Sequence, residues 1–254
     1  MYGSSRHRVP ALAARALGKR YGRTWALRDC TLELPEGRIA ALVGPNGAGK
    51  TTLLNMSVGL TPPTAGAVEV FGRAVPVGGG EVLADVGFVA QDHPMYAGFT
   101  VAEMLRLGRA LNRRWDEELA RARLGALGIP LGRRVGRLSG GQQAQVSLAL
   151  VLAKRPRLLI LDEPLSSLDP LARRDFADGL VAAARAGGLT VLLSSHVLSE
   201  LEALCDYLVV IRDGLVRVAG GVDELLTASG TTLEELVLRH LRGGAAGVEP
   251  LEVA

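Results

Sequence analysis

Short runs of apolar residues recur along the chain, each bounded by glycine, proline or polar residues. Such runs are typical of strands buried on both faces, as in a parallel sheet. They lie at residues 39–43, 86–90, 158–161, 189–193 and 208–211. The segment from Ala11 to Leu34 is also strand-like, and Asp213-Gly214 predicts a hairpin turn between two later strands.

Between Gln91 and Pro156 the pattern becomes helical. A capping box at 100–103 opens one helix, Asp116 is placed to cap a second, and a third begins after Gly141. Because strands lie on both sides of it, this block predicts a helical subdomain, about residues 92–156, inserted into an α/β core. After residue 226, a second capping box at 232–235 predicts a helix in a short C-terminal extension, residues 227–254.

Composition narrows the class of protein without naming it. The 254 residues are 48% hydrophobic and 22% charged, as in an ordinary globular protein, and the net charge of +3 is too small to argue for nucleic acid. Cys30 and Cys205 are isolated, which predicts neither a disulfide framework nor a zinc site. The N-terminus lacks the apolar stretch of a signal peptide, and no apolar run approaches the ~18 residues of a membrane span.

A phosphate-binding loop follows the apolar run 39–43. It reads Gly44-Pro45-Asn46-Gly47-Ala48-Gly49-Lys50-Thr51-Thr52, and an apolar helical segment comes after it. The glycines let successive backbone N–H groups converge on one anion, and the helix directs its dipole at the same place. Lys50 suits the β- and γ-phosphates, and the Thr51 hydroxyl suits Mg²⁺. The alternative is a glycine-rich turn with a solvated lysine; both flanks favour nucleotide binding.

Two acids follow the apolar run 158–161, which is a Walker-B arrangement. Asp162 suits the Mg²⁺ shell, usually through water, and Glu163 is placed to orient or deprotonate the attacking water. The alternative, two acids in an ordinary loop, is weak beside a phosphate-binding loop.

A second motif for an anion comes before that strand, and it reads Leu138-Ser139-Gly140-Gly141-Gln142. Ser139 offers a hydroxyl, the glycines free the backbone N–H groups, and a helix follows. One chain would therefore have two anion sites.

In these motifs the chain resembles the ATP-binding-cassette (ABC) ATPases, over about residues 9–226. The resemblance implies a P-loop NTPase core with an antiparallel β subdomain and an inserted helical subdomain.

The resemblance also implies that residues 138–142 are the family's signature motif. Two such chains would pair head to tail, so that the signature of one covers the ATP on the phosphate-binding loop of the other. The resemblance assigns four further residues. Tyr21 would stack on adenine, and the alternative is an ordinary core tyrosine. Gln91 would contact Mg²⁺ and water. Asp169 would reach across the dimer, and His196 would contact the γ-phosphate. One departure is the loss of the arginine and second glutamine that usually follow the signature, where this chain has Gln143-Ala144-Gln145.

The sequence as a whole predicts an ATP-hydrolysing subunit of an ABC transporter, bound at the cytoplasmic face of the membrane to a separate integral membrane permease. The cofactors expected are ATP and Mg²⁺, and a homodimer is the expected form, with no nucleic acid partner. The stretches 91–103 and 195–201 resemble bacterial drug, lipid or polysaccharide exporters, which favours export. Two alternatives are a soluble ABC ATPase acting on ribosomes or DNA and a cassette that clamps ATP without turnover.

Overall fold

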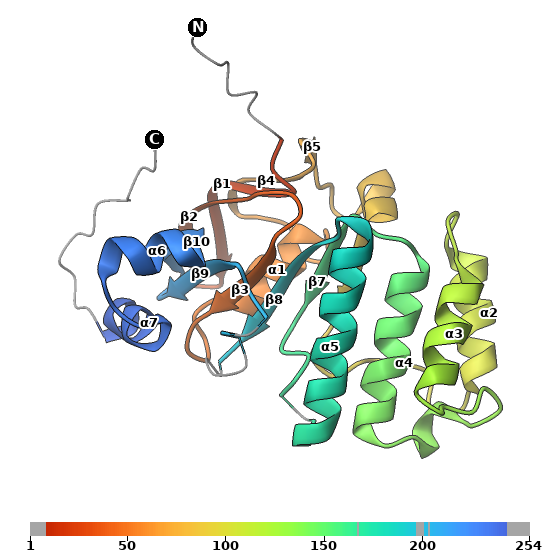
Figure 1. Ribbon diagram of the computed structural model, residues 1–254. Helices are drawn as coiled ribbons and strands as arrows, with labels where there is room; N and C mark the ends of the chain where they lie inside the picture. Colours follow the sequence, from red (N-terminus) through yellow and green to blue (C-terminus); the bar gives the residue numbers. More distant parts are fainter. Residues whose placement is uncertain (1–8, 167, 197–200, 203, 243–254) are drawn as a thin grey trace, which may run out of the picture.

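The computed structural model describes residues 9–166, 168–196, 201–202 and 204–242, and its strands form two sheets (Figure 1). The smaller, four-stranded sheet is antiparallel, in the order β2-β1-β4-β5. Its strands are β1 (Leu12–Tyr21), β2 (Thr24–Leu34), β4 (Ala65–Val70) and β5 (Arg73–Ala74). This sheet is the antiparallel β subdomain expected from the sequence.

The larger sheet has six strands in the order β10-β9-β3-β8-β7-β6. They are β3 (Ile39–Val43), β6 (Val86–Val89), β7 (Leu158–Leu161), β8 (Thr190–Ser195), β9 (Tyr207–Arg212) and β10 (Leu215–Gly221). All neighbours are parallel except β9 and β10, which form the predicted hairpin. Because β3, β7 and β8 are parallel, the residues after Val43, Leu161 and Ser195 meet at one edge, where α/β proteins bind ligands.

Helices pack on both sides of this sheet and at its end (Figure 1). They are α1 (Lys50–Ser57), α2 (Val101–Leu111), α3 (Glu117–Ala126), α4 (Gly140–Ala153), α5 (Pro170–Gly187), α6 (Val222–Ser229) and α7 (Leu233–Arg242). Two short 3₁₀ helices complete the described elements, η1 (Gly80–Asp85) and η2 (Val135–Arg137). Helices α5, α4, α3 and α2 stand side by side, and α2–α4 fall inside the range expected for a helical subdomain.

The helix starts follow from local chemistry. The Thr100 hydroxyl accepts the Glu103 N–H while the Glu103 carboxylate accepts the Thr100 N–H, so the predicted capping box is confirmed. Asp116 caps α3 by accepting the Leu119 N–H, also as predicted. These contacts satisfy N–H groups that have no partner within a helix.

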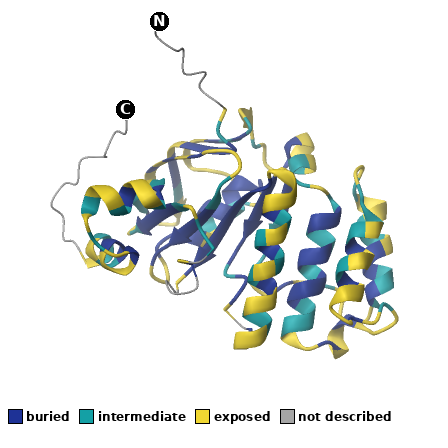
Figure 2. Ribbon diagram, viewed as in Figure 1, coloured by how far each residue is buried: buried dark blue, intermediate teal, exposed yellow. Residues whose placement is uncertain are grey.

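The apolar core lies on both faces of the six-stranded sheet, and its strands are buried while the outer helix faces are exposed (Figure 2). Residues 158–161 are fully buried, as their continuous apolar pattern predicts. A separate cluster packs α2, α3 and α4 together. Within the described residues, no helix has both the length and the apolar character needed to cross a membrane, and Cys30 and Cys205 are free thiols.

Candidate nucleotide-binding site

The phosphate-binding loop is held between two strands from different sheets. A Cβ on Gly44 would lie 2.3 Å from the Ile211 carbonyl oxygen in β9, and one on Gly49 would lie 2.5 Å from the Ala26 carbonyl oxygen in β2. Gly49 also has φ of 103°, a left-handed conformation that favours glycine, and it is the residue before α1. The glycines therefore let the loop fit between its neighbours as well as turn into the helix.

The β9–β10 hairpin fastens this loop to the β subdomain. Gly214 donates its N–H to the Ala48 carbonyl at 3.2 Å, and its own carbonyl accepts the Arg28 N–H at 3.0 Å. Asp213 and Gly214 have φ of 53° and 74°, as a two-residue hairpin turn requires. The sequence predicted the turn but not this contact, because nothing local links residue 214 to residue 48.

Lys50 lies at the first position of α1, and only 6% of it is exposed. Its ammonium donates to the Gly44 carbonyl at 2.7 Å and to the Pro45 carbonyl at 3.3 Å, and lies 3.4 Å from Glu163 Oε1. Residues 45–47 form the exposed tip of the loop, and the Thr51 side chain is exposed beside them in the helix's first turn. A buried ammonium held by two loop carbonyls at the start of a helix is suited to receive phosphate oxygens.

The two acids after β7 are tied to β8 by Ser194. Its hydroxyl donates to Asp162 Oδ1 at 2.7 Å and accepts the Glu163 N–H at 2.8 Å. Strands β7 and β8 pair Leu161 with Leu193, so Asp162 and Ser194 are the next residues along each strand. Ser194 is fully buried and Asp162 is 2% exposed. Sequence reasoning missed Ser194, because its role depends on which strand lies beside β7.

Glu163 contacts two of the predicted site residues at once. Its Oε1 faces Lys50, and its Oε2 lies 2.9 Å from His196 Nδ1. A carboxylate can only accept, so the imidazole donates from Nδ1. Glu163 has φ of 45°, a left-handed conformation that is uncommon for a non-glycine residue and that recurs at functional sites. The structure thus brings Lys50, Asp162, Glu163 and His196 together from three strand ends.

The signature forms the start of α4. Ser139 and Gln142 make a capping box, with both hydrogen bonds at 3.2 Å, while Leu138 is buried. A Cβ on Gly141 would lie 2.7 Å from the Ala172 Cβ, so α4 and α5 approach closely here. In the described part of the chain, no hydrogen bond or ion pair joins residues 138–142 to residues 44–52.

Three predicted residues remain, Tyr21, Gln91 and Asp169. Tyr21 is 52% exposed, with Lys19 Nζ 5.2 Å from its ring centroid, so it is not a core tyrosine. Gln91 is exposed in the turn that follows β6. The Asp169 carboxylate accepts the Leu171 and Ala172 N–H groups and so caps α5, a role that the sequence reasoning did not assign to it.

The donor chemistry fits Mg²⁺ held mainly by phosphates and water. Among the described residues no group of three or more His, Cys, Asp or Glu side chains converges as a metal site. Mg²⁺ commonly uses only one or two protein oxygens beside phosphate oxygens. Thr51 and the buried Asp162 offer such oxygens, and Gln91 would offer a third.

Together, the parallel sheet, the glycine loop and the acid pair define a P-loop nucleotide-binding protein that carries an additional signature helix. A family model described as "ABC transporter" matches residues 27–166. A shorter match, "AAA domain, putative AbiEii toxin, Type IV TA system", covers residues 136–202. The chain belongs to the ABC transporter family, and its architecture is that of the family's ATP-binding cassette.

Curated relatives agree with this assignment. The spermidine/putrescine import ATP-binding protein PotA of Methylococcus capsulatus is 39% identical over 214 residues, 81% of this chain and 54% of that protein. The Nod factor export ATP-binding protein I of Cupriavidus pinatubonensis is 38% identical over 225 residues, 84% of this chain and 68% of that one. The aliphatic sulfonates import ATP-binding protein SsuB of Escherichia coli K12 is 36% identical over 214 residues, 84% of this chain and 81% of that one.

This chain therefore spans about half the length of PotA and most of SsuB. A solved structure of an "ATP binding subunit of ABC transporter" superposes with a TM-score of 0.79 at 28% identity, covering 91% of this chain and 99% of that one. This superposition confirms the fold class predicted from the sequence.

Proposed function

We propose that this protein is an ATP-hydrolysing subunit of an ABC transporter, bound peripherally at the cytoplasmic face of the cell membrane and powering transport through a separate membrane subunit. The observation that carries the proposal is the Glu163 carboxylate, which contacts Lys50 on one side and His196 on the other, beside the buried Asp162. A base, a phosphate-binding cation and a metal-binding acid at one sheet edge are what phosphoryl transfer to water requires.

The chain's residues divide the reaction between them. The α1 N-terminus and the loop N–H groups bind the phosphates. The Lys50 ammonium then leaves Glu163 and the loop carbonyls and donates to phosphate oxygens instead. Glu163, released from Lys50, accepts a proton from the attacking water, while His196 holds its other oxygen and faces the γ-phosphate. Thr51 and Asp162 would hold Mg²⁺, with Gln91, and the ion would neutralise charge on the phosphates. Tyr21 presents an exposed ring on which adenine stacks.

The signature completes a second copy's site. Ser139 and the first N–H groups of α4 form an anion-binding end without contact to this chain's own loop. A two-fold pair of chains places each signature over the partner's ATP and makes two equivalent sites. ATP then holds the dimer together, and its hydrolysis loosens it.

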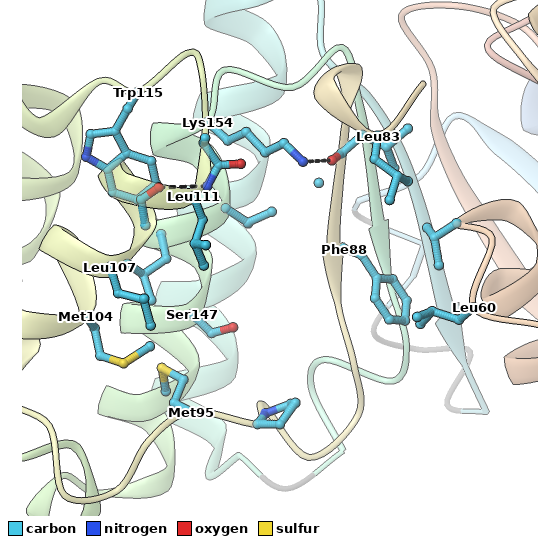
Figure 3. A pocket seen from close by; sticks show the side chains of 18 residues that line it. Leu60, Leu83, Phe88, Met95, Met104, Leu107, Leu111, Trp115, Ser147 and Lys154 are labelled. Carbon is cyan, nitrogen blue, oxygen red and sulfur yellow. Dashed lines mark hydrogen bonds between the residues drawn. The ribbon is translucent and has the colours of Figure 1, made fainter. Parts of the chain in front are cut away.

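An apolar groove between the core and the helical subdomain supports a membrane partner. It encloses about 390 Å³, and Figure 3 shows the side chains that line it. Met95, Met104 and Leu107 line one side, and Leu60 and Phe88 line the other. Its lining includes the exposed side chains of Leu60 and Leu111, an arrangement that marks binding sites for other chains. Pro94 and Met95 follow Gln91 closely in sequence, so a helix of the membrane subunit seated here would sense changes at the nucleotide.

Export is the direction we propose. The stretch 91–103 resembles exporters, as does 195–201, of which residues 197–200 lie outside the described part. Cupriavidus Nod factor export protein I supports export, whereas PotA and SsuB are named importers. Inverted membrane vesicles test the direction: ATP-dependent accumulation of cargo inside them indicates export, and ATP-dependent loss of preloaded cargo indicates import.

Purification from native membranes tests the partner. The tagged chain should bring down an integral membrane protein, and Leu111→Asp should reduce that recovery by placing a charge in the groove. Val77→Asp is the matched control, because Val77 is exposed to a similar extent, 68% against 74%, and does not line the groove. Recovery of ribosomes or DNA instead would favour the soluble alternative.

A further inference from the structure

A partly buried arginine lies where three helices meet. Arg123, in the last turn of α3, donates from Nη2 to Gln145 Oε1 of α4 at 2.9 Å and from Nη1 to the Gly179 carbonyl of α5 at 3.3 Å. Gln145 is 5% exposed. One side chain therefore links α3 of the helical subdomain to the two helices that begin at the signature and at Asp169.

The surroundings of Arg123 are specific to it. A Cβ on Gly179 would lie 2.1 Å from Nη2, so the guanidinium in this position lies directly against the α5 backbone at a glycine. Among the described residues Arg123 forms no ion pair with a carboxylate; its two hydrogen bonds go to neutral oxygens. Burial lowers the pKa of Arg123, which shows that keeping the charge there costs free energy.

Two contacts fix how α4 and α5 cross. The first is the close approach of Gly141 and Ala172 near the helix starts. The second is the Arg123 bridge, which reaches α4 at Gln145 and α5 at Gly179. Because Ser139 caps α4 and Asp169 caps α5, the crossing sets the relative position of these two motif residues.

We propose that Arg123 is a positioning residue that aligns the signature with Asp169 and so controls assembly of the ATP-bound dimer. This inference rests on the sandwiched dimer of the proposed function. It also accounts for the absence of an arginine after the signature. The guanidinium in this part of the structure is that of Arg123 in α3, which donates to Gln145.

The test measures ATP-dependent dimerisation by size exclusion in a Glu163→Gln background, with nucleotide affinity of the dilute monomer measured separately. Arg123→Gln should raise the ATP concentration needed for dimerisation by about tenfold or more, while the monomer's nucleotide affinity and its Tm change little. Such a shift corresponds to about 1.4 kcal/mol for each of the two ATP molecules in the dimer. Loss of a residue that merely stabilises the fold would lower Tm and leave the ATP concentration needed for dimerisation unchanged.

Arg121→Gln is the matched control, because Arg121 lies on the same helix but is exposed and pairs with Glu117. The double change Arg123→Gln with Gln145→Arg returns a guanidinium to the same place from α4 and should restore dimerisation. This rescue keeps the inference testable even if Arg123→Gln alone folds poorly.

Three outcomes overturn the inference, and they differ in what else they remove. If the Glu163→Gln parent stays monomeric at saturating ATP, the sandwiched dimer is wrong and the role of Arg123 is lost with it. If the parent dimerises and Arg123→Gln dimerises equally well, only the role of Arg123 is wrong. A folded double variant that still fails to dimerise leads to the same conclusion.

Discussion

Lys50 Nζ lies 3.4 Å from Glu163 Oε1, and both side chains are nearly buried, at 5% and 11% exposed. Solvent screens such a pair less than a surface ion pair. Lys50 and Glu163 therefore neutralise each other. In the proposed mechanism nucleotide separates them, so that substrate binding and release of the proposed base coincide.

Lys50→Ala should abolish ATP turnover. The change removes the cation from the phosphates and leaves Glu163 paired only with His196, so kcat should fall about 10²-fold or more. Steady-state phosphate release measures it. Retained turnover would show that residues 44–52 are not the nucleotide site.

Glu163→Gln should separate binding from hydrolysis. The amide cannot act as a base, so turnover should fall about 10²-fold or more, while nucleotide still binds and the dimer persists. Equilibrium binding of ATP and single-turnover hydrolysis distinguish the two effects. Unchanged hydrolysis would assign the base to another residue.

Ser194→Ala should damage both stability and catalysis. It removes the donor to Asp162 and leaves the Glu163 N–H without its acceptor, which should lower the free energy of unfolding by about 1–3 kcal/mol. The kcat should also fall, because both acids lose their common anchor. Denaturant unfolding and ATPase assays measure the two effects.

Ser57→Ala is the control for that change. The Ser57 hydroxyl is also buried but donates only to the Leu53 carbonyl within α1. It should cost some stability and leave kcat close to wild type. Equal kcat losses in the two variants would mean that Ser194 has no particular role at the site.

The two thiols should be inert in the folded protein. Burial raises the pKa of Cys30 to about 12 and that of Cys205 to about 12, so little thiolate forms at pH 8. Iodoacetamide at pH 8 should label neither before unfolding and both in guanidinium. Because the pKa values of both thiols are raised in the folded state, the two thiols contribute fully to stability below pH 9, the ordinary pKa of a thiol. The contribution declines at higher pH, where the unfolded thiols ionise. Cys30 is fully buried and Cys205 only partly, so rapid labelling of Cys30 in the native chain would contradict its burial.

Much of the site could be predicted without the fold. The loop from Gly44 to Thr52, the Asp162-Glu163 pair and the caps at Thr100 and Asp116 are contiguous or nearly contiguous in sequence, so their chemistry depends on backbone geometry that neighbouring residues set. His196 was placed by its order after the other motifs, and the structure puts it 2.9 Å from Glu163.

The amino-acid sequence by itself determined which residues have the chemistry proposed for binding phosphate and activating water, and which residues begin helices, because those properties reside in short segments. Only the tertiary structure decided that Ser194 joins the two acids, that Gly214 holds the phosphate loop and that Arg123 bridges α4 and α5. Each of these contacts joins residues far apart in the chain, and strand order and helix packing alone bring them within hydrogen-bonding distance.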